Sequence, residues 1–521
     1  MNVLLVNSNR EHMPWPTVPL GLCIVASALD RAGHRVSVLD LAFTKRPRQA
    51  VERHARALAP DLVGVTVRNI DNCNFERPVF YLEEIRDSVI AAVRRARPTT
   101  PIVIGGSGVN VAPRDTLRYL GADYAIVGEG EEAIGALADA LEHGASLDAV
   151  PGLLRPDGGT TEARVILDTG RHARGEPPSG RALAQDFCTS VRSHAWRWVD
   201  LERYASLGAP YPIQSKRGCN QRCSYCVYNQ LEGREFRLRE PREVVDEIAY
   251  VVRWHGVRRV DFVDSTFNMP LRHALELCEE LARRALPVEL STMGLNPAAL
   301  TADLLSLMRR AGFANVMCTP ESASDTTLAT LAKGFNRQTL VRAARLLRDA
   351  GLPTYWFFMF GAPGETMHTV RETLSFCEEH IAPTDMVLFT TGIRVHAGTP
   401  LERHCKDSGW FVEDDPLFEP SWYVSPELDL QELYALLVGA AAAHPNWMTN
   451  AETVLDPTRA AIMKRVFSAL GWGGVFWQHL PRLFRFAGRS RRKGFERQLR
   501  ALRAISTPDE VAHRRPSVVS R

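Results

Sequence analysis

Short apolar runs alternate with amphipathic stretches along the first 150 residues. The chain opens on an apolar run at residues 3–6, which ends in the polar loop from Asn7 to Asn9. A strand that is apolar at successive positions is typical of a parallel sheet buried on both faces. Similar runs follow at 36–40, 62–67, 102–106 and 124–127, with helical patterns between them at about 22–32, 48–58, 82–97 and 131–141. This alternation predicts a doubly wound α/β domain over residues 1–150.

Polar and glycine-rich segments follow the strands of this predicted domain. They are Asn7 to Asn9, residues 68–72, Gly105-Gly106-Ser107-Gly108 and Gly128-Glu129-Gly130-Glu131. Ligands of such a sheet bind at the carboxyl ends of its strands, so these segments are the predicted ligand edge. No Gly-x-Gly-x-x-Gly follows the first strand, which disfavours a dinucleotide.

The pattern breaks up between residues 151 and 209 and then resumes. Turn-forming runs such as Asp157-Gly158-Gly159 predict a connector over 151–209. From 210 to 401 six apolar runs again alternate with helical patterns, at 212–215, 260–264, 288–292, 315–319, 354–360 and 386–390. Six such units predict an open, partial TIM barrel, with its chemistry at the carboxyl ends of the strands.

The C-terminal region, residues 402–521, is predicted to be mostly helical. It is rich in aromatic residues, and these either line a substrate pocket or simply pack between helices; they include Trp447, Trp472, Phe476, Trp477, Phe484 and Phe486. A basic run covers 485–497. Most such runs are solvated faces, and docking of an acidic carrier protein is the alternative.

Composition narrows the class of protein. The 521 residues include 63 Lys and Arg against 60 Asp and Glu, so the net charge of +3 gives no sign of a nucleic-acid partner, and we expect none. No apolar run approaches the roughly 18 residues that a membrane span needs. The first residues lack the pattern of a signal peptide. Together these features predict a cytoplasmic protein.

Three of the ten cysteines lie close together, in the segment Gly218-Cys219-Asn220-Gln221-Arg222-Cys223-Ser224-Tyr225-Cys226. The spacing Cys-x3-Cys-x2-Cys offers three thiolates, one fewer than a closed zinc site or an ordinary [4Fe–4S] cluster needs. A cluster held in this way keeps one iron open. The alternatives are three buried thiols or an incomplete zinc loop, and the tight spacing disfavours both. The other cysteines are scattered singly; we expect Cys318 in the core and Cys405 as an inert thiol on a surface helix.

The triplet, with Tyr225 before its last cysteine, resembles the signature of the radical SAM superfamily. The resemblance implies that Cys219, Cys223 and Cys226 bind a [4Fe–4S] cluster. It also implies that the open iron binds S-adenosylmethionine (SAM), which an electron from the cluster cleaves to a 5′-deoxyadenosyl radical. Residues 1 to about 401 are similar to cobalamin-binding members of this superfamily.

The N-terminal part of that similarity rests on Pro19-Leu20-Gly21, Gly105-Gly106 and Val127-Gly128-Glu129-Gly130-Glu131. It implies a Rossmann-like cobalamin-binding domain over 1–150, with contacts from Asn7, Gly105, Gly106, Ser107, Gly128, Glu129 and Gly130. The Asp-x-His-x-x-Gly motif is absent, and His12 and His34 lack its context. The resemblance therefore implies cobalamin with no histidine below the cobalt.

Four residues of the barrel gain a role in binding SAM from the resemblance: Tyr225, Asp264, Glu321 and Arg394. Asp264 follows the second strand, where a carboxylate pairs with the SAM ammonium, or else caps the next helix. Glu321 matches a Glu-Ser after the fourth strand, with helix capping as its alternative. Arg394 resembles an Arg that precedes Pro-Gly-Thr, but Ala397 replaces the proline. The turn from Gly361 to Thr366 is a family marker for which a structural role suffices.

The combination implies a cobalamin-dependent radical SAM C-methyltransferase that acts on an unactivated carbon of a small-molecule biosynthetic intermediate. Some similar proteins instead carry out ring closure, ring contraction or other non-methylating radical reactions, and this alternative stays open. Thiomethylation of tRNA and a sensor without turnover are disfavoured. The expected partners are the small-molecule substrate, which an acidic carrier protein would present in one alternative, and a low-potential electron donor of the flavodoxin or ferredoxin type.

Overall fold

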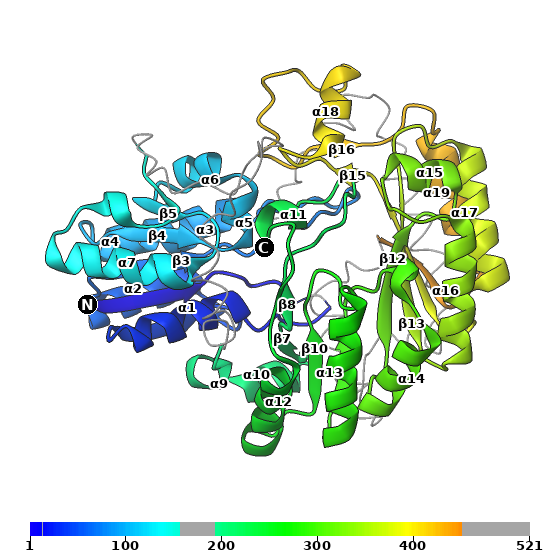
Figure 1. Ribbon diagram of the computed structural model, residues 1–521. Coiled ribbons are helices and arrows are strands. Elements are labelled where there is room, and N and C mark those ends of the chain that lie inside the picture. The colour runs from blue at the N-terminus through cyan, green and yellow to red at the C-terminus, as the bar shows by residue number, and fades with distance from the viewer. Residues whose placement is uncertain (13, 157–192, 451–521) are drawn as a thin grey trace. The chain divides into compact units, whose positions relative to one another are not determined.

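The computed structural model describes residues 1–12, 14–156 and 193–450 (Figure 1). The chain forms two compact units. The first comprises Met1–Asn72, Val79–Ala209 and Gln230–Gly233, and the second comprises Cys73–Pro78, Pro210–Asn229 and the chain from Arg234. A short loop of the N-terminal half therefore belongs to the second unit.

The first unit contains the predicted doubly wound sheet. Its strand order is β2-β1-β3-β4-β5-β6, and the first five strands are parallel. The five parallel strands are β1 (Asn2–Asn7), β2 (Arg35–Asp40), β3 (Leu62–Thr66), β4 (Ile102–Gly105) and β5 (Tyr124–Ile126), and the sixth strand, β6 (Leu153–Leu154), is antiparallel to β5. The strand order reverses at β1 and β3, and ligands of such sheets bind at this kind of position.

Helices cover both faces of this sheet. Helix α1 (Leu20–Arg31) packs with α7 (Gly130–His143), and α2 (Pro47–Leu58) packs with α4 (Ala91–Ala96). The helix expected at 82–97 runs as α3 (Leu82–Ile85), a π-helical turn (Arg86–Ile90) and α4. The remaining helices are α5 (Ser107–Val111), α6 (Pro113–Leu120), α9 (Ala195–Trp198) and α10 (Leu201–Ser206). The expected connector therefore contributes β6, α9 and α10 to this unit.

The second unit is an open barrel, as predicted. All six expected strands are present: β7 (Tyr211–Ile213), β10 (Arg259–Phe262), β11 (Glu289–Thr292), β12 (Val316–Glu321), β13 (Thr354–Phe360) and β14 (Met386–Thr391). They form two parallel sheets, β11-β10-β7 and β12-β13-β14-β17. Single parallel bridges between Leu290 and Phe313 and between Leu295 and Cys318 join the two sheets.

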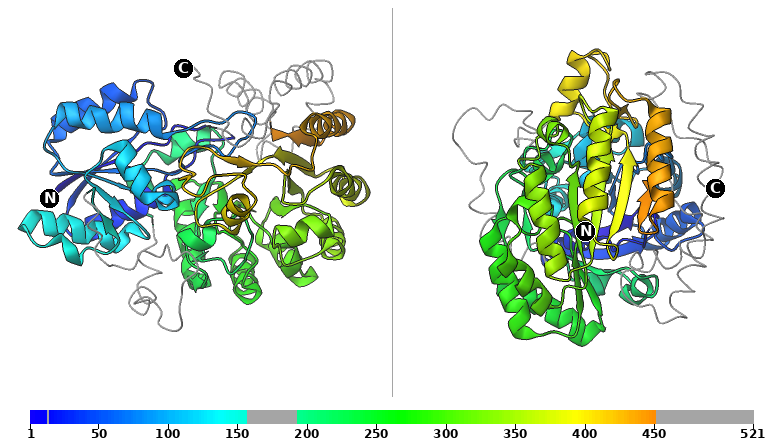
Figure 2. Two further views of the ribbon diagram at one scale, coloured as in Figure 1. Left: turned by 90° about the horizontal axis from the view of Figure 1, so that it is seen from above. Right: turned by 90° about the vertical axis from the view of Figure 1, so that its right-hand side faces the viewer.

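Helices lie on the outer side of the barrel strands (Figures 1 and 2). They are α12 (Pro241–His255), α13 (Leu271–Arg284), α14 (Ala302–Ala311), α15 (Asp325–Thr330), α16 (Arg337–Asp349) and α17 (Met367–His380). Side-chain caps fix several starts, because Thr301, Asn336 and Thr366 each accept a bond from a backbone N–H of the first turn. No helix among the described residues is long and apolar enough to cross a membrane.

The described part of the C-terminal region adds to the barrel. It contains α18 (Pro400–Asp407), β16 (Trp422–Tyr423), α19 (Leu430–Ala443) and β17 (Trp447–Thr449). Strand β17 pairs with β14 and extends the barrel sheet, which the sequence pattern does not predict. Trp447 is therefore a core residue of a strand, 2 % exposed. The other five predicted C-terminal aromatics and the basic run at 485–497 lie outside the described residues.

The turn from Gly361 to Thr366 has a structural role: the side chain of Glu365 holds its backbone. Glu365 is fully buried, and its Oε2 accepts bonds from the amides of Gly361 (2.6 Å) and Ala362 (3.0 Å). Gly361 has a φ of 117°, in the region that favours glycine. Burial raises the pKa of Glu365 to about 7, although the two amides lower it.

We expect Glu365→Gln to reduce the pH dependence of stability. The unfolded carboxyl ionises near its ordinary pKa and the folded one only near 7, so this group's contribution to stability is lost as pH rises between those two values. Thermal unfolding at about pH 5 and about pH 7 measures this, and the melting temperature of the variant should change less between the two. Glu413→Gln, at an exposed position, is the control and should follow the unmodified protein. Equal pH dependence in all three proteins would contradict the assignment.

Candidate active site

The cysteine triplet lies in a loop at the carboxyl end of β7, the edge at which barrel enzymes carry their chemistry. The loop begins after β8 (Lys216–Arg217), which pairs with β9 (Arg237–Leu238) on the far side of the loop in the sequence. Gly218 has a φ of 99°, and a Cβ there would lie 2.0 Å from the Glu235 carbonyl oxygen. Only glycine fits this close approach, so Gly218 determines where the chain turns toward Cys219.

The three thiols come from one loop, and packed segments hold them in place. Cys219 is 7 % exposed, and its Sγ lies 3.9 Å from Thr266 Oγ1. The Ser224 amide donates to the Leu331 carbonyl (3.0 Å), and the Leu401 amide donates to the Ser224 carbonyl (2.9 Å). The Cys223–Cys226 half of the loop is therefore tied to two distant segments of the second unit.

The three cysteines fit an iron–sulfur cluster, because three thiolates leave the fourth iron of a [4Fe–4S] cluster open. Burial raises the pKa of Cys226 to about 12 and also raises that of Cys223, so a positively charged group is needed to hold them as thiolates. A cubane of four irons supplies that charge.

Tyr225 and Glu321, two of the predicted SAM contacts, lie together beside the triplet. The Tyr225 hydroxyl donates to Glu321 Oε1 (2.6 Å). Glu321 ends β12 with a φ of 66°, a conformation unusual for glutamate, so local packing holds this carboxylate in its place. The position of both residues agrees with the expectation, and their contact with SAM stays a proposal.

The same group contains a residue that the sequence does not mark. Lys333 donates from Nζ to the Thr319 carbonyl (3.0 Å), to the Tyr225 hydroxyl (3.2 Å) and to Glu321 Oε1 (3.4 Å). It lies 108 positions after Tyr225 and belongs to no motif. Only the fold brings it to the cluster loop.

Asp264 has a different environment from the expected one. It is fully buried and forms an ion pair with Lys216, whose side chain is 1 % exposed, at an Nζ–Oδ2 distance of 3.1 Å. Its other oxygen accepts a bond from the Ser215 amide (2.8 Å). The carboxylate therefore anchors the start of the cluster loop to the end of β10, and it has no exposed oxygen to offer a SAM ammonium.

The Arg394 side chain also has its hydrogen-bond partners within the second unit. It is 5 % exposed, and its guanidinium donates to the carbonyls of Val395, Leu417, Phe418 and Ser421. Arg394 therefore holds the segment 417–421 against the end of β14. Thr399 caps α18 through its side chain, so the turn forms despite Ala397.

The predicted cobalamin edge lies in the first unit, and the structure divides its residues into two kinds. Asn7 is buried and donates from Nδ2 to Asp40 Oδ1 (2.8 Å), so its amide aligns the ends of β1 and β2. At Gly106 an added Cβ would lie 2.7 Å from the Val67 carbonyl oxygen, so this glycine is needed for packing.

Gly105 and Gly128, in contrast, have nothing within 4 Å of an added Cβ. Asn110, which the sequence did not mark, holds Gly128 through two bonds with its amide and carbonyl. Ser107 donates to the Arg68 carbonyl, while Glu129 and Gly130 begin α7. The open space beside Gly105 and Gly128 fits a large flat ligand such as a corrinoid.

Two cysteines outside the triplet are core residues. Cys318 in β12 is fully buried, as expected. Cys405 is not on a surface: it is fully buried in α18, within an apolar cluster that includes Val395, Leu401 and Phe411. Burial raises the pKa of Cys405 to about 12, so it is an inert thiol for a reason other than the predicted one.

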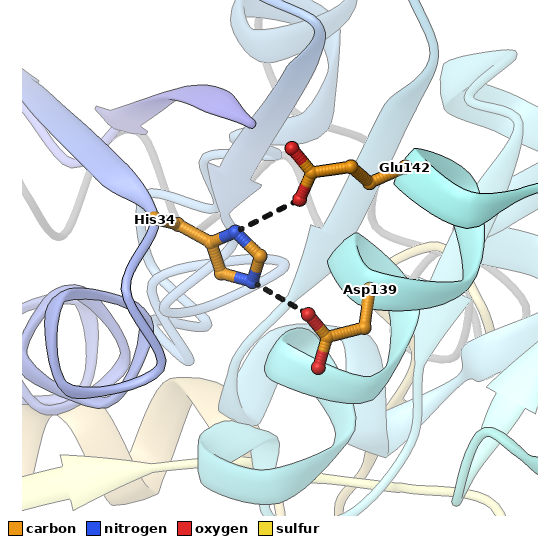
Figure 3. A group of neighbouring side chains, drawn as sticks. All are labelled: His34, Asp139 and Glu142. Atoms are coloured by element: carbon orange, nitrogen blue, oxygen red, sulfur yellow. Dashed lines mark ion pairs between the residues drawn. The ribbon is translucent and has the colours of Figure 1, made fainter.

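A second polar group lies in the first unit (Figure 3). The His34 imidazole lies between two carboxylates of α7, with Nε2 3.4 Å from Asp139 and Nδ1 3.8 Å from Glu142. Because the carboxylates face opposite nitrogens of one ring, they do not converge on a single ligand nitrogen. We therefore assign this group to packing between the start of β2 and α7.

Comparisons with known proteins bear on both units. A model of the B12 binding domain matches residues 12–138, and a model of the radical SAM superfamily matches 213–377. The tryptophan 2-C-methyltransferase of Streptomyces laurentii is 29% identical over 450 residues, which cover 75% of this chain and 72% of that protein. The anaerobic magnesium-protoporphyrin IX monomethyl ester cyclase of Synechocystis is 27% identical over 345 residues, or 65% and 63%.

A solved structure covers nearly the whole chain. It is a radical S-adenosylmethionine methyltransferase of Kitasatospora setae with cobalamin and a [4Fe–4S] cluster bound, with a TM-score of 0.79 and 26% identity over 96% of this chain and 99% of that one. The same enzyme with tryptophan and a SAM analogue has a TM-score of 0.76 at 25% identity, with the same coverage of both chains.

We expect Asp264→Asn to destabilise the protein by roughly 3–5 kcal/mol, because it leaves the Lys216 ammonium buried without a counter-charge. Chemical unfolding measures the change. The double variant Asp264→Asn/Lys216→Met should recover part of the loss, since it removes the unpaired charge. Unchanged stability combined with weaker SAM binding would instead support the role first expected for Asp264.

Proposed function

Because this chain belongs to the cobalamin-binding radical SAM enzymes, we propose that it is a C-methyltransferase that acts on an unactivated carbon of a small-molecule biosynthetic intermediate. One observation carries the proposal: a loop at the carboxyl end of β7 presents three cysteines, and no more. The likeness over 96% of the chain to a methyltransferase solved with the same cofactors supports it.

The cofactors are a [4Fe–4S] cluster, SAM and cobalamin. When bound, the cluster supplies the electron for reductive cleavage of SAM, and the corrinoid carries the methyl group. Cys219, Cys223 and Cys226 would hold the cluster. The backbone at Gly105 and Gly128, which has open space beside it, would contact the corrinoid, with Asn110 keeping Gly128 in place.

Tyr225 and Glu321 are the residues that we propose for SAM. Their side chains meet beside the triplet, and the Glu321 carboxylate is an acceptor for an ammonium. Burial raises the pKa of the Tyr225 hydroxyl far above its usual range, and the Glu321 carboxylate adds to this effect. Tyr225 therefore remains a neutral donor that orients Glu321 at every pH at which the enzyme works.

Tryptophan is the first substrate to test, because a relative that matches three quarters of this chain is named for methylation of it. A low-potential donor of the flavodoxin or ferredoxin type would supply the electron. Presentation of the substrate on an acidic carrier protein remains a further proposal. The test with free tryptophan does not require such a carrier.

A second candidate is a non-methylating radical reaction such as ring closure. The observation that favours it is the identity of 27% with a magnesium-protoporphyrin monomethyl ester cyclase. That match covers less of both proteins than the match with the tryptophan methyltransferase. We therefore place methylation first.

Anaerobic turnover with SAM, cobalamin, a low-potential reductant and tryptophan tests the proposal. Mass spectrometry should detect S-adenosylhomocysteine together with a singly methylated product. Deuterated SAM labels the transferred methyl group and distinguishes it from background. Tryptophan analogues and acyl-carrier-bound forms extend the test if the free amino acid is not methylated.

Cys223→Ala is the matched variant, and Cys278→Ala is its control, because Cys278 is fully buried in α13, outside the cysteine loop. The first change should abolish cluster-dependent SAM cleavage and leave cobalamin binding intact, whereas the second should retain the cluster. 5′-Deoxyadenosine with a dehydrogenated or cyclised product and no methyl transfer would favour the second candidate. Full activity of Cys223→Ala would contradict both.

A further inference from the structure

Lys333 is a buried cation whose surroundings suggest more than packing. It follows α15 in a tight turn in which Ala332 and Gly334 have φ values of 52° and 73°. Its side chain is 7 % exposed. Burying an ammonium has a large free-energy cost unless partners compensate it, and lysine rarely occupies such a position without a reason.

The partners of Lys333 are those of the site. Its Nζ donates to the Thr319 carbonyl, to the Tyr225 hydroxyl and to Glu321. Since Tyr225 also donates to Glu321, the three side chains form a closed triangle of polar contacts. The ammonium lies 5.6 Å from the centre of the Tyr225 ring, an aromatic face that favours a cation.

Backbone bonds fix the turn to the cluster loop. The Ser224 amide, between Cys223 and Tyr225, donates to the carbonyl of Leu331, two residues before Lys333. The charge therefore has a constant position relative to the Cys223–Cys226 half of the loop, and it cannot swing away as a surface lysine does.

The same contacts place the ammonium beside the thiols. The Tyr225 hydroxyl lies 3.2 Å from Lys333 Nζ, and Tyr225 directly precedes Cys226 in the loop. The Glu321 carboxylate pairs with the same ammonium at 3.4 Å, so a cation and an anion lie side by side next to this half of the loop. Removal of either charge therefore changes the electrostatic potential at the loop.

We propose that Lys333 is a positioning residue that raises the reduction potential of the cluster while it holds Tyr225 and Glu321 in place. Reduction adds one electron, taken from a ferredoxin- or flavodoxin-class donor, and no bond forms or breaks. The added negative charge is stabilised by a fixed cation nearby, and charge and hydrogen bonds around a cluster set its potential. The inference rests on the cluster and is independent of whether the product is methylated.

The test is a redox titration of the anaerobically reconstituted full-length enzyme, without SAM or substrate, followed by the EPR signal of the reduced cluster. Lys333→Met keeps the length and apolar stem of the side chain and removes the charge, so the midpoint potential should become more negative. Lys333→Arg keeps the charge and should restore most of the potential. Lys406→Met is the control, because Lys406 pairs with Glu402 on α18, outside the triangle. The midpoint potential of the cluster should not change in this variant.

Glu321→Gln tests the same field from the opposite side. It removes the negative partner and keeps the cation, so the midpoint potential should become more positive, and this holds even if Lys333→Met fails to take up iron. Iron and sulfide content establish equal cluster loading before each comparison. An unchanged potential in fully loaded Lys333→Met, or a negative shift in Glu321→Gln, would overturn the proposal. Absence of methyl transfer in the unmodified enzyme, together with the expected shifts of the midpoint potential in the variants, would instead count against the proposed function alone.

Discussion

The buried ion pair between Lys216 and Asp264 is the contact on which the rest of the site depends. It joins the end of β7 to the end of β10 immediately before the chain turns at Gly218 into the cluster loop. Ser215 reinforces it through its amide and hydroxyl, and the Lys216 ammonium also donates to the Phe267 carbonyl. Because both charges are withdrawn from water, neither can move away without leaving the other buried and without a counter-charge, which has a large free-energy cost. The three thiols therefore start from a rigid base.

A second charged group holds the far end of the same loop. Tyr225, Glu321 and Lys333 meet beside Cys223 and Cys226, and the bond from Ser224 to Leu331 joins their backbones. One pair of opposite charges thus precedes the triplet and another accompanies its end. The two groups differ in function: the first is saturated by its own partners, whereas the second includes the carboxylate proposed for SAM and the cation proposed to adjust the cluster.

Much of the site was readable from the sequence because it depends on local spacing. Cys219, Cys223 and Cys226 lie within one loop, and the turn from Gly361 to Thr366 contains its own donors and acceptors. Asp264 and Arg394 were assigned correctly to the ends of strands, but their partners come from other strands and loops. Lys216 pairs with the Asp264 carboxylate, and the carbonyls of 417–421 accept bonds from the Arg394 guanidinium, so both groups already have partners within the protein. Lys333 and Asn110 belonged to no pattern, since only packing brings them to the residues they hold.

The sequence by itself determined the two α/β units and the cysteine loop, because alternating apolar runs and short-range spacing reflect backbone periodicity and local chemistry. The tertiary structure alone decided three things: that β17 completes the barrel sheet, that Cys405 is buried, and which polar side chains remain available. The physical reason is the same in each case. The pairing of β17 with β14, the burial of Cys405 and the ion pair of Asp264 with Lys216 each depend on residues that are far apart in the chain. Those residues come into contact only when the fold forms.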